Sequence, residues 1–307
     1  MLSPINEIIS ELKNSAKPLS NAKLSELSST NAEELKLLKE VWPTIERKRR
    51  QQIVSRLVAL AEENFELDFD NVFKNCLDDP DAEVRSRAIE GLWENEEPSL
   101  INTLLNLLEH DSSERVQAAA ATGLGRYVML AEHQKFHSSY SSKMYQALLA
   151  IIGDKSKPLE VKRRALEAIA PKSSPRVERA ISEAYHNGHP KLKASSIYAM
   201  GKNCSPAWLP ILLKELSNTD AEIRYEAAGA CGEIGEEEAV PYLINLVEDP
   251  DLEVQLATIQ ALGKIGGTEA KNRLEQCLDD DSEVIQQAAE QALRELIEGE
   301  EPLSFSF

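Results

Sequence analysis

Apolar and small residues recur along most of the chain at the spacing of helix faces, and this pattern returns about every 31 residues. The clearest pair of copies is DAEIRYEAAGACGEIGEEEAVPYLINLVED at 220–249 and DLEVQLATIQALGKIGGTEAKNRLEQCLDD at 251–280. A branched residue three positions after the leading Asp serves as an anchor for each copy. The anchors are Val84, Val116, Val161, Leu192, Ile223, Val254 and Val284, which are 32, 45, 31, 31, 31 and 30 residues apart. The periodic sequence therefore predicts a row of similar structural units.

In each unit the sequence pattern predicts a first helix, a tight turn and a second helix. Small residues four positions past the anchor and apolar residues eight past it form one stripe of the second helix. Residues of the type that caps helix N-termini precede the anchors, at Asp81, Ser113, Asp220, Asp251 and Asp281. Glycines nine past the anchor are expected near the end of the second helix, at Gly125, Gly201, Gly232 and Gly263. Pro210 and Pro241 stand early in two of the first helices, where proline is tolerated.

The D-x-E-V-R and A-L-G-x-I-G elements of these units resemble the HEAT repeats of the phycobilisome-lyase-like group found in many bacterial proteins, over roughly residues 65–297. The resemblance implies an all-α protein, an α-α superhelix (HEAT-repeat solenoid) of about eight helical hairpins with N-terminal capping helices. The expected domains are an N-terminal helical cap at 1–42, the solenoid at 43–298 and a C-terminal tail at 299–307. We expect the tail, ending in LSFSF, to cover the last repeat; the other interpretation is that another protein binds it.

One step between anchors is 45 residues, so about 14 residues are inserted between the second and third anchored units. They fall in 127–145, and we predict a lengthened helix followed by a Ser-rich loop. Insertions in solenoids project from one edge, which makes this segment a candidate for partner contact.

The net charge of −18 is distributed unevenly along the 307 residues. Residues 203–307 hold 6 basic and 23 acidic side chains, a net −17, whereas residues 154–202 hold 11 basic and 5 acidic side chains, a net +6. The acidic end would repel phosphate, so nucleic-acid binding through the basic middle repeats and the basic run at 47–50 is an alternative that we rank below protein binding.

No targeting or membrane segment is recognised. The first ten residues lack the basic and apolar regions of an export signal, and no run of about 18 uncharged apolar residues occurs. We therefore expect a cytoplasmic protein without membrane contact. The cysteines stand singly and are expected to be small core hydrophobes in a reducing compartment; they are Cys76, Cys204, Cys231 and Cys277.

The sequence shows no catalytic motif, neither a phosphate-binding Gly-x-x-x-x-Gly-Lys loop nor a Gly-x-Ser-x-Gly elbow. His133 and His137 would share a helix face, but the His-Glu-x-x-His pattern is missing. Deoxyhypusine hydroxylase, a HEAT-like enzyme, uses His-Glu dipeptides as metal ligands, and none of the five histidines here is followed by Glu. We predict no catalytic residue, metal or cofactor. A lyase-like enzyme or enzyme subunit for a linear tetrapyrrole stays an alternative through the family resemblance.

A partner surface is predicted on the second helices, at positions two and six past the anchors. Tyr198, Tyr225 and Leu256 come from three successive units and have the composition of a binding hot spot. The basic residues expected around them are Arg163, Arg164, Lys193 and Arg224. The other interpretation is that the tyrosines pack along the next helix and that basic residues one past each anchor bridge the repeats. On this basis we expect a non-catalytic scaffold, a monomer, that binds a protein partner on its concave face.

Overall fold

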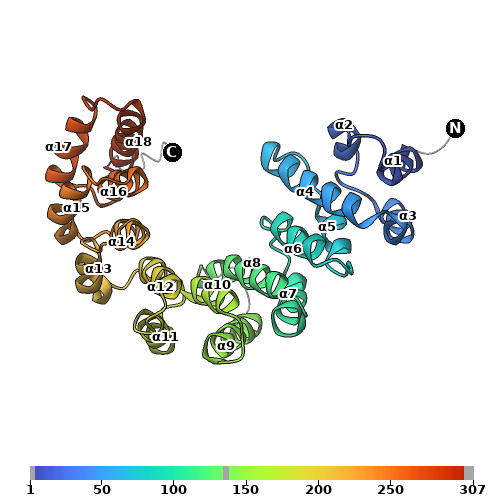
Figure 1. The fold of residues 1–307 in the computed structure, drawn as a ribbon, viewed down its shortest axis with the longest axis horizontal. Helices are drawn as coiled ribbons and strands as arrows, with labels where there is room; N and C mark the ends of the chain where they lie inside the picture. The colour runs from blue at the N-terminus through green and yellow to red at the C-terminus, as the bar shows by residue number, and fades with distance from the viewer. Residues whose placement is uncertain (1–3, 134–137, 301–307) are drawn as a thin grey trace, which may run out of the picture. The chain divides into compact units, whose positions relative to one another are not determined.

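The computed structural model describes residues 4–133 and 138–300. Within them the chain forms α-helices and short 3-10 helices and no strand, and consecutive helices pack in pairs (Figure 1). The predicted all-α class of stacked helical hairpins is confirmed. The chain divides into two compact units, unit 1 at Met1–Ala168 and unit 2 at Ile169–Phe307.

The helices are numbered in chain order, and odd numbers from α3 onward are the first helices of their hairpins. Unit 1 holds α1 (Pro4–Lys13), α2 (Asn21–Ser25), α3 (Ala32–Val41), η1 (Trp42–Thr44), α4 (Arg47–Glu63), α5 (Asp70–Cys76), α6 (Ala82–Gly91), α7 (Pro98–His110), α8 (Glu114–Glu132), α9 (Ser138–Gly153) and nearly all of α10 (Leu159–Ile169). Unit 2 holds α11 (Pro175–Tyr185), α12 (Pro190–Asn203), η2 (Pro206–Trp208), α13 (Leu209–Glu215), α14 (Ala221–Ile234), η3 (Glu237–Ala239), α15 (Val240–Leu246), α16 (Leu252–Ile265), α17 (Gly267–Cys277) and α18 (Glu283–Glu300).

Each unit has two layers of helices (Figure 1). In unit 1 the second helices α4, α6 and α8 pack side by side, and the first helices α5 and α7 pack against α6 and α8. In unit 2 the second helices α12, α14, α16 and α18 form one layer, and α11, α13, α15 and α17 form the other. We call the layer of second helices in each unit its second-helix layer.

The predicted anchors lie in the core between the layers. Val84, Val116 and Val254 are fully buried, and the Asp81 carboxylate accepts hydrogen bonds from the backbone of Glu83 and Val84 at 3.0 and 3.1 Å. The expected caps at Asp220 and Asp251 are also present. Ser113 stands at the predicted N-cap position of α8 but makes no side-chain cap bond. Its backbone N–H donates to Asp111 at 2.8 Å instead.

The last unit is shifted by one residue from its predicted register. Val284 is 49% exposed, whereas Ile285 is 3% exposed and takes the anchor position. The step from Val254 is then 31 residues, as in the preceding units. The expected cap at Asp281 is likewise misplaced, because α18 begins only at Glu283. Two neighbouring branched residues made the register ambiguous in the sequence.

Gly201, Gly232 and Gly263 lie near the ends of their second helices, as predicted, at points where two second helices approach closely. Gly125 lies further inside its helix, because α8 continues to Glu132. A methyl group on Gly201 would stand 2.7 Å from Ala230 Cα, and one on Gly232 would stand 2.8 Å from Ala261 Cα. Gly263 meets Ala292 in the same way. Real side chains do not approach backbone so closely, so these positions require glycine. In unit 1, Gly125 lies against Ala168. We call this series the glycine ladder.

The insertion is helical where the structure describes it. Helix α8 continues to Glu132, as the predicted lengthened helix requires, and residues 134–137 lie outside the described part. The expected Ser-rich loop is wrong from Ser138 onward, where α9 begins. Met144, Leu148 and Ile151 are buried on one face of α9, and this apolar face stabilises the helix through the serines.

A buried polar network lies where the helices preceding α4 meet α4 and the turn before α6. Asp79 accepts a hydrogen bond from Trp42 Nε1 at 2.7 Å and forms an ion pair with Arg50 at 2.8 Å. The Arg50 side chain is 8% exposed, and it also donates to the Ile45 carbonyl at 2.6 Å. The Asp79 side chain is fully buried.

The four cysteines were expected to lie in the core. Cys76, Cys231 and Cys277 are buried as predicted, whereas Cys204 is exposed at the end of α12. None of the helices in residues 4–133 and 138–300 has the length and apolarity that crossing a membrane requires.

The C-terminal LSFSF tail, which was expected to cover the last repeat, lies outside the described part of the chain.

Candidate functional site

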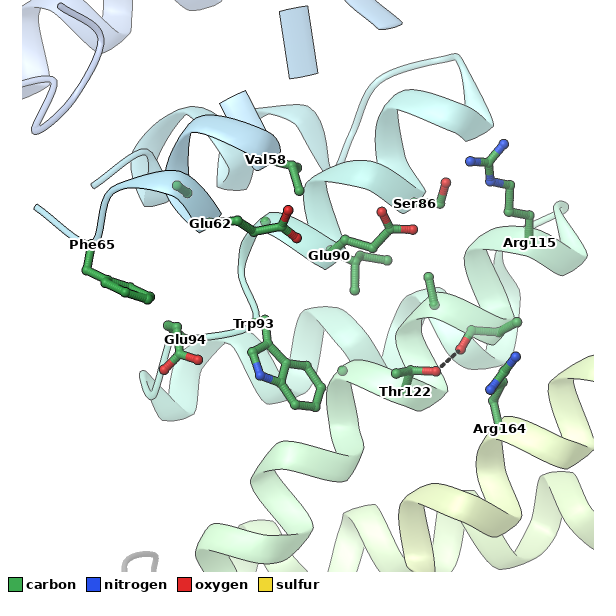
Figure 2. Close-up of a pocket in the computed structure, with 16 residues that line it drawn as sticks. Val58, Glu62, Phe65, Ser86, Glu90, Trp93, Glu94, Arg115, Thr122 and Arg164 are labelled. Carbon is green, nitrogen blue, oxygen red and sulfur yellow. Dashed lines mark hydrogen bonds between the residues drawn. The ribbon is translucent and has the colours of Figure 1, made fainter. Parts of the chain in front are cut away.

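A hollow of about 540 Å³ lies on the second-helix layer of unit 1, over α4, α6 and α8 (Figure 2). We call it the unit 1 pocket. Sites for small molecules are commonly hollows of about 300–1,000 Å³. Its lining residues are Val58, Ala61, Glu62, Phe65, Ser86, Ile89, Glu90, Gly91, Trp93, Glu94, Arg115, Ala118, Ala119, Thr122, Gly123 and Arg164.

The helices that form the floor of the unit 1 pocket carry small side chains there, and these leave the hollow unfilled. Ala118 and Thr122 stand two and six positions past the anchor of α8, the surface positions of a second helix. The Thr122 hydroxyl donates to the Ala118 carbonyl at 3.2 Å, so its polar atom is turned back onto its own helix (Figure 2). Gly91 is required for another reason: a methyl group there would lie 2.5 Å from the Phe73 ring. The floor is therefore apolar and shallow.

The two ends of the unit 1 pocket differ in chemistry. Phe65 and Trp93 lie at one end, and Arg115 and Arg164 lie at the other (Figure 2). Phe65 is 93% exposed and Trp93 is 45% exposed. Exposed rings of this size beside a hollow provide flat apolar contact area, and guanidinium groups bind carboxylates or phosphates. The arrangement suits a flat apolar molecule with acidic groups at one end.

Carboxylates hold the two arginines in place. Arg164 forms ion pairs with Glu160 at 2.8 Å and with Glu167 at 2.9 Å, and Arg115 forms one with Glu83 at 3.4 Å. Burial opposes the charge of Arg164, but the coulombic effect of Glu167 and Glu160 outweighs it and raises the pKa of Arg164. The guanidinium at this end of the pocket therefore stays charged.

The sequence-predicted tyrosines meet at a second hollow, of about 230 Å³, in unit 2. Tyr198 on α12 and Tyr225 on α14 both line it and are 38% and 42% exposed. Leu256, half-buried on α16, is not among its lining residues. The structure thus brings together two of the three predicted apolar residues.

The predicted basic residues around the tyrosines hold the repeats together. Arg224 forms a two-point contact with Asp249, both bonds at 2.7 Å, and Lys193 pairs with Glu215 at 2.8 Å. Each contact joins a second helix to the next hairpin, as does that between Arg85 and Asp111. These residues thus bridge successive repeats, and their acceptors are Glu215, Asp249 and Asp111.

The two remaining predicted residues lie on α10 in unit 1. Arg163 pairs with Glu160 on its own helix at 2.7 Å. Arg164 lines the unit 1 pocket and so belongs to a different site from the one predicted.

The Arg224–Asp249 ion pair should make the stability of the folded protein depend on pH. Hydrogen bonds from Arg224 hold the pKa of Asp249 below its usual value, although burial opposes this effect. Because the pKa is lower in the folded chain than in the unfolded chain, the pair contributes stability above pH ~4, and this is lost as the pH falls through the folded pKa. We expect Asp249→Asn to lower the melting temperature at pH 7 and to flatten its decline below pH ~5. Thermal unfolding at several pH values measures both effects.

Asp279→Asn, in an exposed turn, is the matched control for Asp249→Asn. It should leave both the melting temperature and its pH dependence near those of the unchanged chain. An equally steep acid decline in Asp249→Asn would show that the ion pair does not contribute to it.

The described part of the chain contains no group of three or more His, Cys, Asp and Glu side chains placed to hold a metal ion. His133 is exposed at the end of α8, and His137 lies outside the described residues. The described residues therefore do not provide the repeated His-Glu ligands of a HEAT-type metal site.

Sequence reasoning named Arg164 but missed the other three residues at the ends of the unit 1 pocket. Phe65 and Trp93 follow α4 and α6 in turns, where the helical period gives no signal, and Arg115 precedes its anchor by one residue. The one available sign was the set of small residues at the surface positions of α6 and α8, Ser86, Ala118 and Thr122.

Comparison with known proteins identifies the repeat. The family model for HEAT repeats matches residues 71–159 and 209–294, which together make up more than half of the chain. The chain belongs to the HEAT-repeat family. The resemblance inferred from the sequence is thereby confirmed for this HEAT-repeat protein.

This HEAT-repeat protein is similar over part of its length to one curated protein, and its fold is similar to those of solved structures. Deoxyhypusine hydroxylase of Drosophila pseudoobscura pseudoobscura is 32% identical over 100 residues, which is 32% of this chain and 33% of that protein. The chain thus spans about a third of this curated relative. The complex of CpcE and CpcF of phycocyanin lyase from Nostoc sp. PCC7120 matches with a TM-score of 0.54 at 16% identity, over 92% of this chain and 97% of that one. Human deoxyhypusine hydroxylase matches with a TM-score of 0.37 at 16% identity, over 96% of each chain.

These relatives overturn two expectations from the sequence. The chain was expected to be a non-catalytic scaffold, yet its sequence relative is a hydroxylase and the Nostoc structure is a lyase. The expectation that it is not an enzyme is contradicted by the same findings. The sequence showed no sign of a site because a solenoid forms a pocket from side chains of several repeats, and no short sequence motif indicates such a pocket.

Proposed function

We propose that this HEAT-repeat protein is an enzyme subunit of the lyase type and that the unit 1 pocket binds a linear tetrapyrrole. The observation that carries the proposal is the pocket itself, with two aromatic side chains at one end and two arginines at the other (Figure 2). The likeness to the Nostoc phycocyanin lyase complex supports the choice of ligand and the expectation of a protein partner.

The two ends of the pocket offer contacts for the two chemical parts of such a ligand. A linear tetrapyrrole is a flat conjugated chain with two propionate groups. Phe65 and Trp93 offer ring faces for its conjugated part, and Arg115 and Arg164 offer guanidinium groups for its carboxylates. A volume of about 540 Å³ lies within the range of small-molecule sites.

Acidic side chains between the two ends add a second kind of contact. Glu62 and Glu90 lie between the aromatic residues and the arginines (Figure 2). Ionised carboxylates accept hydrogen bonds, and pyrrole N–H groups donate them. The contribution of this chain is thus to bind the tetrapyrrole and to fix its orientation, which lowers the entropic part of a reaction barrier.

Titration of the purified protein with biliverdin, a linear tetrapyrrole, tests the proposal through its visible absorption and induced circular dichroism. We expect saturable binding that weakens about tenfold in Trp93→Ala and by at least about 100-fold in the double variant Arg115→Gln, Arg164→Gln, since each of the two lost charged hydrogen bonds costs about 1.5–3 kcal/mol. Equal binding by all variants, or no induced signal in the unchanged protein, would exclude the pocket as a tetrapyrrole site.

Two control variants match the test substitutions. Tyr242→Ala removes an aromatic side chain that is 49% exposed in unit 2, close to the 45% exposure of Trp93. Arg56→Gln removes a unit 1 arginine whose ion pair is with Glu63, outside the pocket lining. Both should bind biliverdin like the unchanged protein, and far-ultraviolet circular dichroism should show that every variant keeps its helices.

A further inference from the structure

The second-helix layer of unit 2 carries a hollow of its own, built by α12, α14 and α16. Its volume of about 230 Å³ is below the usual range of small-molecule sites and is suited to one long side chain. We call it the unit 2 hollow. Its lining residues are Tyr198, Lys202, Tyr225, Glu226, Gly229, Ala230, Glu233, Ala257, Gln260, Ala261 and Lys264.

The hollow exists because α14 has a glycine at a surface position. Gly229 stands six past its anchor, where the neighbouring repeats have Tyr198 and Gln260. A methyl group on Gly229 would meet nothing within 4 Å, so packing does not require glycine there. Glycine inside a helix costs about 0.5–1 kcal/mol relative to alanine. A costly residue without a packing reason, between two exposed tyrosines, indicates a binding role.

The charges in the lining of the hollow balance, and the chain that follows α12 is strongly acidic. Lys202 lies over the Tyr198 ring, 5.7 Å from its centroid, so a ring face in this hollow already interacts with a cation. Lys202 and Lys264 both pair with Glu233, at 3.1 and 2.8 Å, and with Glu226 the lining holds two basic and two acidic side chains. Residues 203–307 carry 6 basic and 23 acidic side chains, a net −17, and would attract a basic segment and repel nucleic acid.

We propose that the unit 2 hollow is a docking site for a basic, arginine-bearing segment of a partner protein, with one arginine side chain inserted between Tyr198 and Tyr225. A guanidinium group is planar and stacks on aromatic rings while its N–H groups reach carboxylates such as Glu226. The acidic surface of unit 2 attracts the rest of the segment. The proposal concerns unit 2 alone and does not rest on tetrapyrrole binding.

Fluorescence anisotropy with a labelled synthetic peptide of alternating arginine, alanine and leucine tests the proposal. The control peptide has citrulline in place of each arginine, which keeps the shape and removes the charge. We expect the unchanged protein to bind the arginine peptide at least about tenfold more tightly than the citrulline peptide, with affinity falling as salt is added. Absence of salt-dependent binding to the arginine peptide would overturn the proposal.

Three variants separate the hollow from the general acidity of the chain, because none of them changes the net charge. Gly229→Leu fills the hollow where there is free space, and it should weaken peptide binding about tenfold while the protein stays folded. Tyr225→Ala should weaken it several-fold. Tyr242→Ala, on α15 outside the hollow, should bind normally. Normal binding by Gly229→Leu, or an equal loss in Tyr242→Ala, would show that the peptide binds elsewhere.

Discussion

Replacing Asp79 by alanine should lower the free energy of unfolding of unit 1 by about 3–5 kcal/mol. The carboxylate is fully buried and accepts hydrogen bonds from Trp42 and Arg50. Its removal leaves a buried guanidinium without its counter-charge and an indole N–H without its acceptor, and both groups lost their water on folding. The loss should loosen the contact between the N-terminal helices and the hairpin that begins at α5.

Denaturant unfolding followed by tryptophan fluorescence and circular dichroism measures this effect. Trp42 and Trp93 report on unit 1, and Trp208 reports on unit 2. Asp78→Ala is the matched control, since Asp78 is the exposed neighbour of Asp79 and should change stability by no more than about 0.5 kcal/mol. A loss below about 1 kcal/mol in Asp79→Ala would mean that the network contributes little.

Two glycines of α14 should respond to the same substitution with opposite signs. Gly232→Leu places its Cβ 2.8 Å from Ala261 Cα, so α14 and α16 must separate, and we expect a loss of about 3 kcal/mol or more. Gly229→Leu meets open space on the same helix, and the better helix propensity of leucine should increase stability by about 0.8 kcal/mol. The helix, the starting residue and the introduced residue are identical, so only the surroundings differ.

Thermal and denaturant unfolding of the two variants provide the comparison. Gly232→Leu should unfold well below the unchanged protein, and Gly229→Leu slightly above it. Similar stability of the two variants would show that the close approach at Gly232 relaxes without cost, and the glycine ladder would then have no energetic role.

Much of the fold can be predicted from the sequence because burial in a hairpin repeat follows local periodicity. Val84, Val116 and Val254 are buried since each stands where its own helix faces the core. The same reasoning fails for the last unit, where Val284 and Ile285 are adjacent and either satisfies the pattern. Only the packing of α18 on α16 and α17 decides between them.

The candidate site could not be predicted in the same way, because its residues come from four helices and two turns. Arg115 and Arg164 are 49 positions apart in the sequence and line one pocket. Trp93 follows α6 in a turn, where no period applies. Tyr198 and Tyr225 could be paired because equal positions in successive repeats become neighbours. The absence of any packing contact at Gly229 depends on the positions of α12 and α16, which the sequence does not give.

The glycine ladder has a consequence for how such a chain can change in length. Each rung joins a glycine nine past one anchor to an alanine seven past the next, as between Gly232 and Ala261 or Gly263 and Ala292. The 14 additional residues between Val116 and Val161 leave the rung from Gly125 to Ala168 in place. A whole hairpin that is duplicated or deleted would therefore find matching neighbours on both sides, and gene segments encoding 31 residues could be gained or lost without redesign of the core.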